Sequence, residues 1–180
     1  LSIPAISAES IYYVSPAGDD ENDGERPEDA FATIQMAIDT VSPAGEDAVI
    51  LRIAAGTYQE NIVLKSGISL DGGWNSDFSE QWDFAKEGYE PVEAFKVTID
   101  GGGETVQEPC LKAENVQDLT VSGLTLENGR GVQGGGFSIV NSTCTLLHLR
   151  FADNMAMGKT GSGNSAWYTF GDAIYISSSD

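Results

Sequence analysis

The sequence predicts an all-β protein of the parallel β-helix type, a solenoid with one α-helix near its N-terminus. Three observations support this prediction. Short segments with alternating apolar residues follow one another from residue 48 onward, and an apolar–x–apolar motif recurs at nearly constant spacing. Only residues 31–41 have the period of an amphipathic helix. Glycine, at 21 of 180 residues, gathers between the apolar segments, which favours strands joined by tight turns.

The first part of the chain, residues 1–47, is expected to contain a strand, an acidic turn and the helix. Residues 11–14, Ile-Tyr-Tyr-Val, predict the strand, and residues 15–27 are rich in Asp, Glu, Gly and Pro, as turns are. Thr33 is a good N-cap for the helix, and a Ser-Pro-Ala-Gly motif ends it. The apolar face of the helix, at spacing i, i+3, i+4 and i+7, consists of Ile34, Ala37, Ile38 and Val41.

The second part, residues 48–180, is expected to form the coils of the same structural domain. Strands are predicted at residues 49–53, 61–65, 68–71, 96–100, 119–121, 124–127, 137–140, 145–147, 149–152 and 173–176. Two insertions, residues 75–95 and 155–170, add length between strands. Insertions in repeat proteins form loops that often lie on the binding face. A fresh repeat begins near the end of the sequence, so the solenoid is expected to be open at its C-terminus.

The recurring motif sets the register of the predicted coils. Its second apolar position is occupied in turn, at nearly constant intervals, by Leu70, Ile99, Leu126 and Phe151. A second series supports the repeat, because Gly-Gly-Gly-Phe at residues 134–137 recurs in altered form at residues 171–174. A propeller blade needs about 40 residues and its own signature, and a leucine-rich repeat has fixed Leu and Asn spacing. Neither pattern occurs here, whereas the spacing suits a coil of two or three short strands.

The charge balance is strongly acidic, with 28 Asp and Glu against 9 Lys and Arg and a formal net charge of −19. Such a surface repels phosphate backbones, which excludes nucleic acid as a partner. No apolar run approaches the ~20 residues that cross a bilayer, so no membrane span is expected. One His and two Cys fit neither a His-rich metal site, nor a zinc motif, nor a disulfide scaffold.

Two groups of motifs resemble those of secreted bacterial β-helix proteins. Tyr-Tyr-Val-Ser-Pro-Ala-Gly-Asp at residues 12–19 and Phe-Ala-Thr-Ile-Gln-x-Ala-Ile at residues 31–38 resemble the N-terminal cap of pectin-lyase-like proteins, some of which are polysaccharide lyases. Phe-x-x-Asn at residues 151–154 and the glycine-rich motifs at residues 134–137 and 171–174 are similar to polymorphic outer-membrane protein repeats, which occur in surface-displayed adhesins. The resemblance implies a right-handed parallel β-helix whose helix covers one end of the core.

Two sets of acidic side chains are candidate calcium ligands, and calcium is the one candidate cofactor. The alternating acids of the first turn are Asp19, Glu21 and Asp23. Stacking the repeats would place a second set in one outward column, made of Asp71, Asp100 and Glu127. Unpaired carboxylates in coils about 4.8 Å apart repel one another unless a cation or a basic side chain lies between them. The alternative is a solvated acidic surface with a turn ordered by Asx-type hydrogen bonds.

Side chains in or near the long loops are candidate ligand contacts. They are Trp74, Trp82, Tyr89, Arg130, Trp167 and Tyr168. Aromatic faces stack on sugar rings, which suggests a glycan platform. The alternative is that the rings of the first insertion pin that loop to the flank of the solenoid. The single histidine, His148, occupies the turn position that Gly123 holds one repeat earlier, which favours a turn residue over a catalyst.

Two asparagines and two cysteines carry structural predictions. Asn128 and Asn154 are separated by close to one coil and are expected to stack and form hydrogen bonds along the solenoid. Cys144 aligns with Leu119, an inward position, and is expected to be a buried thiol. Cys110 falls outside that column, which argues against a disulfide between the two cysteines.

These features favour a secreted or cell-surface scaffold with a binding or adhesion role towards glycans or other surface molecules. The small residues among the first eight resemble those around signal-peptide cleavage sites, which suggests export. Arg150 and Lys159 lie outside any lyase motif, and the motifs of β-helical glycoside hydrolases are missing. A polysaccharide lyase or glycoside hydrolase is the enzymatic alternative. The second alternative is a protein that self-associates through its open last coil, because an exposed strand edge is a template for pairing.

Overall fold

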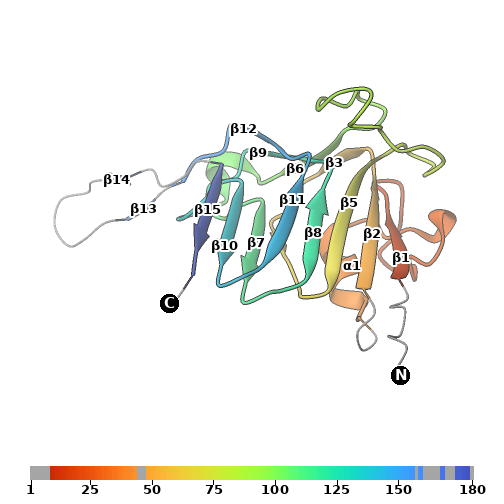
Figure 1. Ribbon diagram of the computed structural model, residues 1–180, viewed down its shortest axis with the longest axis horizontal. Helices are drawn as coiled ribbons and strands as arrows, with labels where there is room; N and C mark the ends of the chain where they lie inside the picture. Colours follow the sequence, from red (N-terminus) through yellow and green to blue (C-terminus); the bar gives the residue numbers. More distant parts are fainter. Residues whose placement is uncertain (1–8, 44–47, 157, 160–166, 169–172, 179–180) are drawn as a thin grey trace, which may run out of the picture.

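The computed structural model describes residues 9–43, 48–156, 158–159, 167–168 and 173–178, most of which lie in or between parallel strands (Figure 1). Sheet I has the strand order β1 (Glu9–Val14), β2 (Ala48–Ala54), β5 (Ile68–Trp74), β8 (Leu119–Ser122) and β11 (Cys144–Leu147). Sheet II runs β3 (Gly56–Tyr58), β6 (Val97–Asp100), β9 (Leu124–Glu127) and β12 (Arg150–Ala152). Sheet III runs β4 (Ile62–Val63), β7 (Leu111–Glu114), β10 (Phe137–Val140) and β15 (Ile174–Ser177).

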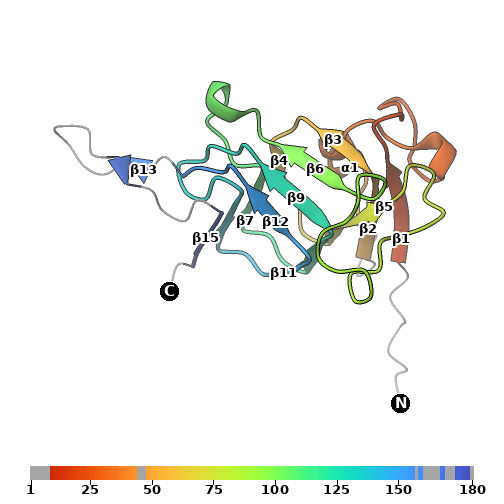
Figure 2. The ribbon, with the colours of Figure 1, turned by 90° about the horizontal axis from the view of Figure 1, so that it is seen from above.

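The chain visits these sheets in a fixed order, I then II then III, and we call one such passage a circuit (Figures 1 and 2). The circuits begin at β2, β5, β8 and β11 in turn. Neighbouring strands within each of the three sheets are parallel. In sheet II, Ile99 pairs with Leu126 and Leu126 with Phe151, which confirms the last two steps of the predicted repeat. The strand-rich fold and its parallel sheets agree with the predicted class.

Alternation within the strands builds the main hydrophobic cluster. In sheet I, Leu51 pairs with Leu70, which pairs with Val121, and all three are buried. Sheet III adds a column in which Leu111 pairs with Phe137. Successive side chains of a strand point to opposite faces, so each strand contributes every second residue to this cluster. Cys144 pairs with Leu119 as predicted, and it packs against the cluster while staying partly exposed.

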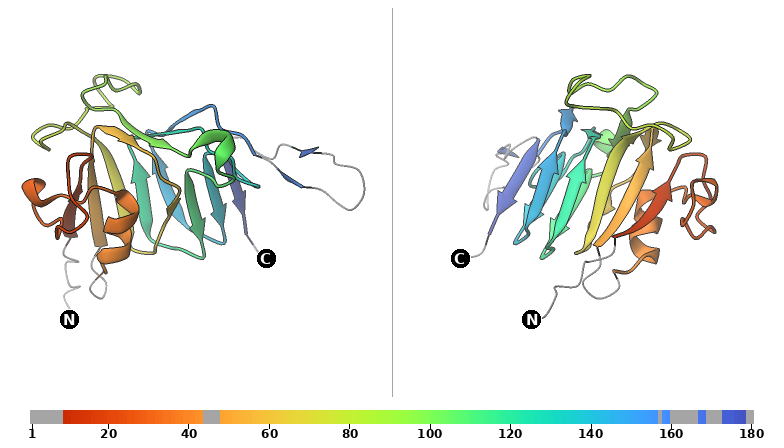
Figure 3. Two further views of the ribbon diagram at one scale, coloured as in Figure 1. Left: turned by 180° about the vertical axis from the view of Figure 1, so that it is seen from behind. Right: turned by 45° about the vertical axis from the view of Figure 1, so that its right-hand side comes forward.

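The α-helix, α1 (Ile34–Thr40), lies at the β1 end of the sheets (Figure 3, left). It begins later than the predicted range, because Phe31 forms a bridge with Val14 and Thr33 has an extended backbone. The Thr33 side chain accepts a hydrogen bond from the backbone N–H of Met36, so the predicted N-cap is confirmed. Three helix residues belong to the main hydrophobic cluster, namely Ile34, Ala37 and Ile38.

The predicted register is wrong for the first of its four positions. Leu70 lies in sheet I, whereas Ile99, Leu126 and Phe151 lie in sheet II. In sheet II, the residue of the preceding circuit that pairs with Ile99 is Tyr58. Any strand with one buried face shows an apolar–x–apolar motif, whichever sheet it belongs to. The motif therefore does not predict which sheet a strand joins. The interval from Leu70 to Ile99 therefore joins two strands of the same circuit.

Asn128 and Asn154 do not stack on each other as predicted, but each forms the expected hydrogen bond to a neighbouring circuit. Glu127 pairs with Ala152, so Asn154 is out of register with Asn128 by a single position. Asn154 instead donates to the carbonyl of Leu126 (2.8 Å) and accepts from the backbone N–H of Gly129 (2.9 Å). A stacked asparagine pair lies after sheet III, where the Asn141 amide donates to Asn115 Oδ1 at 3.5 Å. Both members of this second pair have positive φ.

The corners between sheets share a left-handed backbone conformation. Gly123 and His148 occupy equivalent corners after sheet I, with φ of 68° and 52°, which confirms the predicted equivalence. Asn128 and Asp153 are likewise equivalent after sheet II, with φ of 59° and 51°. Glycine, asparagine and aspartate tolerate this conformation best, so the corners account for the recurrence of these residue types.

Three strand predictions need correction. The sequence analysis does not predict β3 and β7. β3 has a single buried residue, Tyr58, and β7 has only the short alternation in which Leu111 and Ala113 are buried. The predicted strand at residues 61–65 shortens to β4. Residues 75–95 form the expected long loop, whereas the second insertion is described only in part and contains the antiparallel pair β13 (Gly158–Lys159) and β14 (Trp167–Tyr168).

Some sequence predictions fall on residues outside the described part of the structure. These are the opening residues 1–8 and the first half of the glycine-rich motif at residues 171–174. Among the described residues, no helix has the length and apolarity needed to cross a bilayer.

Candidate functional site

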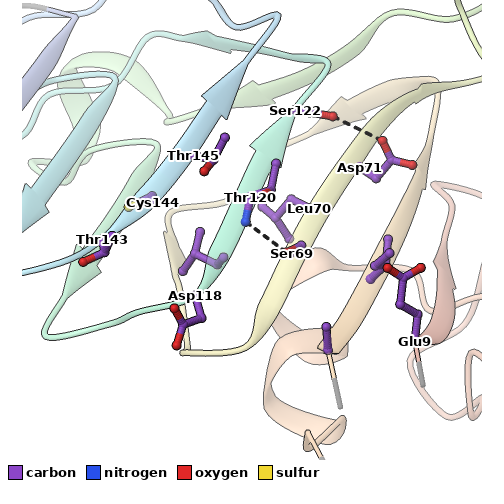
Figure 4. A pocket seen from close by; sticks show the side chains of 13 residues that line it. Glu9, Ser69, Leu70, Asp71, Asp118, Thr120, Ser122, Thr143, Cys144 and Thr145 are labelled. Atoms are coloured by element: carbon purple, nitrogen blue, oxygen red, sulfur yellow. Dashed lines mark hydrogen bonds between the residues drawn. The ribbon is translucent and has the colours of Figure 1, made fainter. Parts of the chain in front are cut away.

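A groove of about 490 Å³ lies along the solvent-facing side of sheet I (Figure 4). Hydroxyl groups dominate its polar lining, from Ser69, Thr120, Ser122, Thr143 and Thr145. Three carboxylates also line it, those of Glu9, Asp71 and Asp118. Its apolar floor includes Leu70 and Leu119, which belong to the main hydrophobic cluster. The groove therefore combines apolar surface with a row of small hydrogen-bonding groups.

The groove follows a local separation of β5 from β8. These strands pair only at Leu70–Val121 and Asp71–Ser122. Before that point a serine hydroxyl takes the place of a backbone carbonyl, because the N–H of Thr120 donates to Ser69 Oγ at 2.9 Å (Figure 4). A side-chain bridge is longer than a direct ladder hydrogen bond, so the two strands stand further apart here. The separation gives the groove its access to Leu70 and Leu119.

The hydroxyl groups form a ladder across three strands. Ser69 contacts the backbone of Thr120, and Thr120 pairs with Thr145. Each of the three stands between two apolar residues and points away from the core, as strand alternation requires. Our sequence interpretation missed these residues. The signal that would have found them is an apolar–Ser/Thr–apolar triplet in successive circuits.

The electrostatics of the groove are negative. Glu9, Asp71 and Asp118 line it, and no Lys, Arg or His does so among the described residues. Cys144 is the one sulfur in the lining, and burial raises the pKa of its thiol. A protonated, partly buried thiol is a poor nucleophile. The groove is therefore suited to hydrogen bonding with a ligand that carries no negative charge.

Asp71 lies at the upper end of the groove and is not part of the predicted acidic column. Its carboxylate accepts from Trp74 Nε1 (3.0 Å), Gln81 Nε2 (2.9 Å) and Ser122 Oγ (3.2 Å). The hydrogen bond from Gln81 ties the first insertion to β5. Because Asp71 belongs to sheet I, it does not join Asp100 in a column, and the error has the same origin as that for Leu70.

Asp100 and Glu127 do pair with each other on neighbouring strands of sheet II. Asp100 Oδ1 accepts from the N–H of Gly102 (3.0 Å) and from Asn128 Nδ2 (3.1 Å). The Asp100 carboxylate is thus used to order the corner. Across the described residues, no three His, Cys, Asp or Glu side chains group closely enough to hold a metal ion.

The acidic turn is ordered by its own carboxylates. Asp19 Oδ1 accepts from the N–H of Glu21 (3.0 Å), and Asp23 Oδ1 accepts from the N–H of Glu25 (3.1 Å). These are Asx turns, the alternative that the sequence leaves open. Asp20, which the sequence interpretation passed over, accepts from the N–H groups of Ala32 (2.9 Å) and Thr33 (2.8 Å).

The aromatic residues of the first insertion have two roles. Phe78 is 8% exposed and packs edge-on against Tyr13, with ring centroids 5.0 Å apart. Trp74, the last residue of β5 before the insertion, lies under the Arg52 guanidinium at 4.3 Å and donates to Asp71. These rings attach the loop to the sheets. Tyr89, by contrast, is 75% exposed.

Arg130, another predicted ligand contact, does not line the groove. Arg130 Nη1 donates to the carbonyl of Asp153 at 2.6 Å and so binds a corner after sheet II. Trp167 and Tyr168 belong to β14, and their side chains lie outside the described part of the structure.

Comparison with known proteins adds no family to this picture. No protein-family model, no curated protein and no solved structure matches the chain. The groove combines an apolar floor with converging polar groups, which is the usual form of a ligand site.

Proposed function

We propose that the chain is a secreted or cell-surface scaffold that binds a neutral glycan in the groove of sheet I. The scaffold in this proposal is a right-handed parallel β-helix, with sheets I, II and III as its three faces. The cyclic order of the strands and the regular repeat from Ile99 through Leu126 to Phe151 in sheet II support it. Parallel crossovers are right-handed in nearly all proteins, which supports the hand.

The lining of the groove is the observation that carries the binding proposal. Sugars present hydroxyl groups at their edges and C–H groups on their faces. The ladder of Ser69, Thr120 and Thr145 supplies donors and acceptors for the edges, and the apolar floor suits the faces. Long polymers lie well on such a surface, because the groove crosses several strands instead of closing over a single small molecule.

The charge of the groove favours neutral over acidic glycans. Three carboxylates line it without a basic partner in the lining, and the chain as a whole carries −19. A polyuronate or sulfated glycan would meet repulsion at close range as well as from the whole surface. This is also why a binding role is preferred to a uronate lyase, in which a base must take an α-proton beside a neutralised carboxylate.

A glycan array that contains both neutral and anionic polysaccharides tests the proposal. We expect binding to neutral glycans that weakens by roughly tenfold or more in Thr145→Trp, because the indole fills the groove at an exposed position. The matched control is Thr57→Trp, an exposed threonine on β3 in sheet II, which should bind within about twofold of wild type. Tighter binding to polyuronates than to neutral glycans at low salt would overturn the proposal.

Self-association is a second candidate because the described strands of the last circuit lie at sheet edges. β11, β12 and β15 each pair with one neighbour in their sheets. Ile176 pairs with Ile139 in an otherwise inward column and is 69% exposed, whereas Ile139 is 4% exposed. We expect light scattering to show concentration-dependent oligomers that Ile176→Asp abolishes. A monomer at all concentrations would contradict this candidate without affecting glycan binding.

A further inference from the structure

A second hollow of about 480 Å³ adjoins the groove where the first insertion meets the corner between β11 and β12. The insertion lies above the carboxyl ends of the sheet I strands (Figure 1; Figure 3, right). We call this hollow the aromatic cleft. Its lining includes Trp82, Asp83, Phe84, Leu147 and His148. Ser122 lines both the groove and the aromatic cleft, so the two hollows adjoin at this residue.

The rings of the aromatic cleft are held in place from both sides. His148 has φ of 52° at its corner, and its ring stacks on Phe84 with centroids 4.4 Å apart and planes 4° apart. Tyr89 lies beside His148 at 6.2 Å between centroids. Trp82 Nε1 donates to the carbonyl of Gly88 at 2.8 Å, which fixes the indole within the loop.

A charged contact anchors this arrangement to the sheets. Arg150 of β12 forms an ion pair with Glu90 of the insertion at 2.7 Å. Together with the hydrogen bond from Gln81 to Asp71, it fastens both ends of the ring-bearing segment. A ligand would therefore meet rings that are already positioned, which lowers the entropic cost of binding.

The chemistry of the aromatic cleft matches one residue of a sugar chain. His148 and Leu147 in the lining are exposed, and so is Tyr89 beside His148, which leaves ring and aliphatic surface available for the C–H face of a sugar. Asp83 supplies an acceptor for hydroxyl groups, and the hydrogen bond from Lys86 lowers the pKa of that carboxyl.

We propose that the aromatic cleft is a second subsite for the same neutral glycan, and that the natural ligand is an oligosaccharide long enough to reach from the groove to His148. The inference rests on the proposed function of the groove. It adds a length requirement that the groove alone does not impose.

Calorimetry with cello-, manno- and xylo-oligosaccharides, each as a disaccharide and a hexasaccharide, tests the length requirement. For whichever series binds, we expect His148→Gly and Tyr89→Ala to weaken hexasaccharide binding by roughly tenfold and to leave the disaccharide unchanged. Glycine suits the positive φ of residue 148, so the variant removes the ring with little backbone strain. Tyr175→Ala, on β15 in sheet III, is the matched control.

The outcomes separate the two proposals. If Thr145→Trp weakens the hexasaccharide but His148→Gly does not, the aromatic cleft is no subsite and glycan binding by the groove stands. If no series binds to the wild-type protein, the proposed function fails, and this inference fails with it. Tryptophan fluorescence gives an independent test. If the hexasaccharide quenches the fluorescence of the wild type but not that of Trp82→Phe, the sugar occupies the aromatic cleft.

Discussion

At the scale of single residues, the N-terminus of α1 shows how this chain uses its surplus of carboxylates. Asp20 accepts from the N–H groups of Ala32 and Thr33. Glu60 accepts from those of Ile34 (2.9 Å) and Gln35 (2.8 Å). Two acids far apart in sequence thus satisfy four consecutive N–H groups. Those of Thr33, Ile34 and Gln35 are donors that the helix itself leaves open.

The titration of Glu60 leads to a prediction about stability and pH. Burial raises the pKa of Glu60, and the two backbone hydrogen bonds only partly oppose it. A carboxyl with a raised pKa in the folded state contributes stability below the ordinary carboxyl pKa, and this contribution is lost as pH rises through the folded-state pKa. The free energy of unfolding of wild type, relative to Glu60→Gln, should therefore fall as pH increases from about 4 upward.

Urea denaturation of both proteins across this pH range measures the difference. Glu60→Gln keeps one acceptor for the helix N–H groups and is expected to cost about 1 kcal/mol, as for a weakened cap. A difference in unfolding free energy that stayed constant with pH would show that the pKa of Glu60 is the same in the folded and unfolded states.

At the scale of elements, the long loop at residues 75–95 is anchored to the sheets near its start by Phe78. Phe78 fills a small cluster with Ala30 and Ala54, packed by Tyr13 and Trp74. Its φ of 59° is unfavourable for a bulky residue and costs roughly 1–2 kcal/mol, so packing must hold it there. This anchor sets the position of the ring-bearing segment that follows.

Replacing Phe78 by glycine should release the loop while leaving the sheets intact. Glycine removes the ring but also removes the backbone strain, so the expected loss of global stability is smaller than the roughly 3–5 kcal/mol typical of a buried Phe→Ala change. We expect trypsin to cleave faster after Lys86, with the circular dichroism of the strands unchanged. Tyr89→Ala, which removes an exposed ring from the same loop, should leave the cleavage rate as in wild type. Equal cleavage of Phe78→Gly and wild type would contradict the anchoring role.

At the scale of the whole molecule, the acidic surface raises the question of calcium. Four of the six carboxylates predicted to bind it accept hydrogen bonds: Asp19 and Asp23 within their own turn, Asp71 from three donors, and Asp100 at a corner. We therefore expect the melting temperature in millimolar Ca²⁺ to lie within about 2 °C of that in chelator.

A specific site would behave differently. At one hundred times its dissociation constant, bound Ca²⁺ adds about 2.7 kcal/mol to the stability, which raises the melting temperature by roughly 2–4 °C for each kcal/mol in a chain of this size. The melting temperature is also measured in Mg²⁺ and in NaCl at equal ionic strength. These controls show how much of any rise comes from general screening of a chain with a net charge of −19. A rise specific to Ca²⁺ would restore the calcium hypothesis.

Much of the local structure could be predicted because it depends on neighbours in sequence. Thr33 as the N-cap, the equivalence of Gly123 with His148 and that of Leu119 with Cys144 all follow from local patterns repeated at a constant interval. Strands with alternating apolar residues, and corners rich in Gly, Asn and Asp, belong to the same group. The sequence by itself therefore determined the kinds of elements, the approximate repeat and the residue types at the corners.

Only the tertiary structure decided which strands stand side by side. Leu70 and Ile99 carry the same motif yet lie in different sheets, because a half-buried strand presents the same alternation wherever it pairs. The groove depends on the long-range pairing of β5 with β8, from Leu70 to Val121, and on a hydroxyl inserted in that ladder. The aromatic cleft likewise brings Phe84 onto His148. Such contacts come from the long-range packing of circuits and loops, which no periodicity within a single segment records.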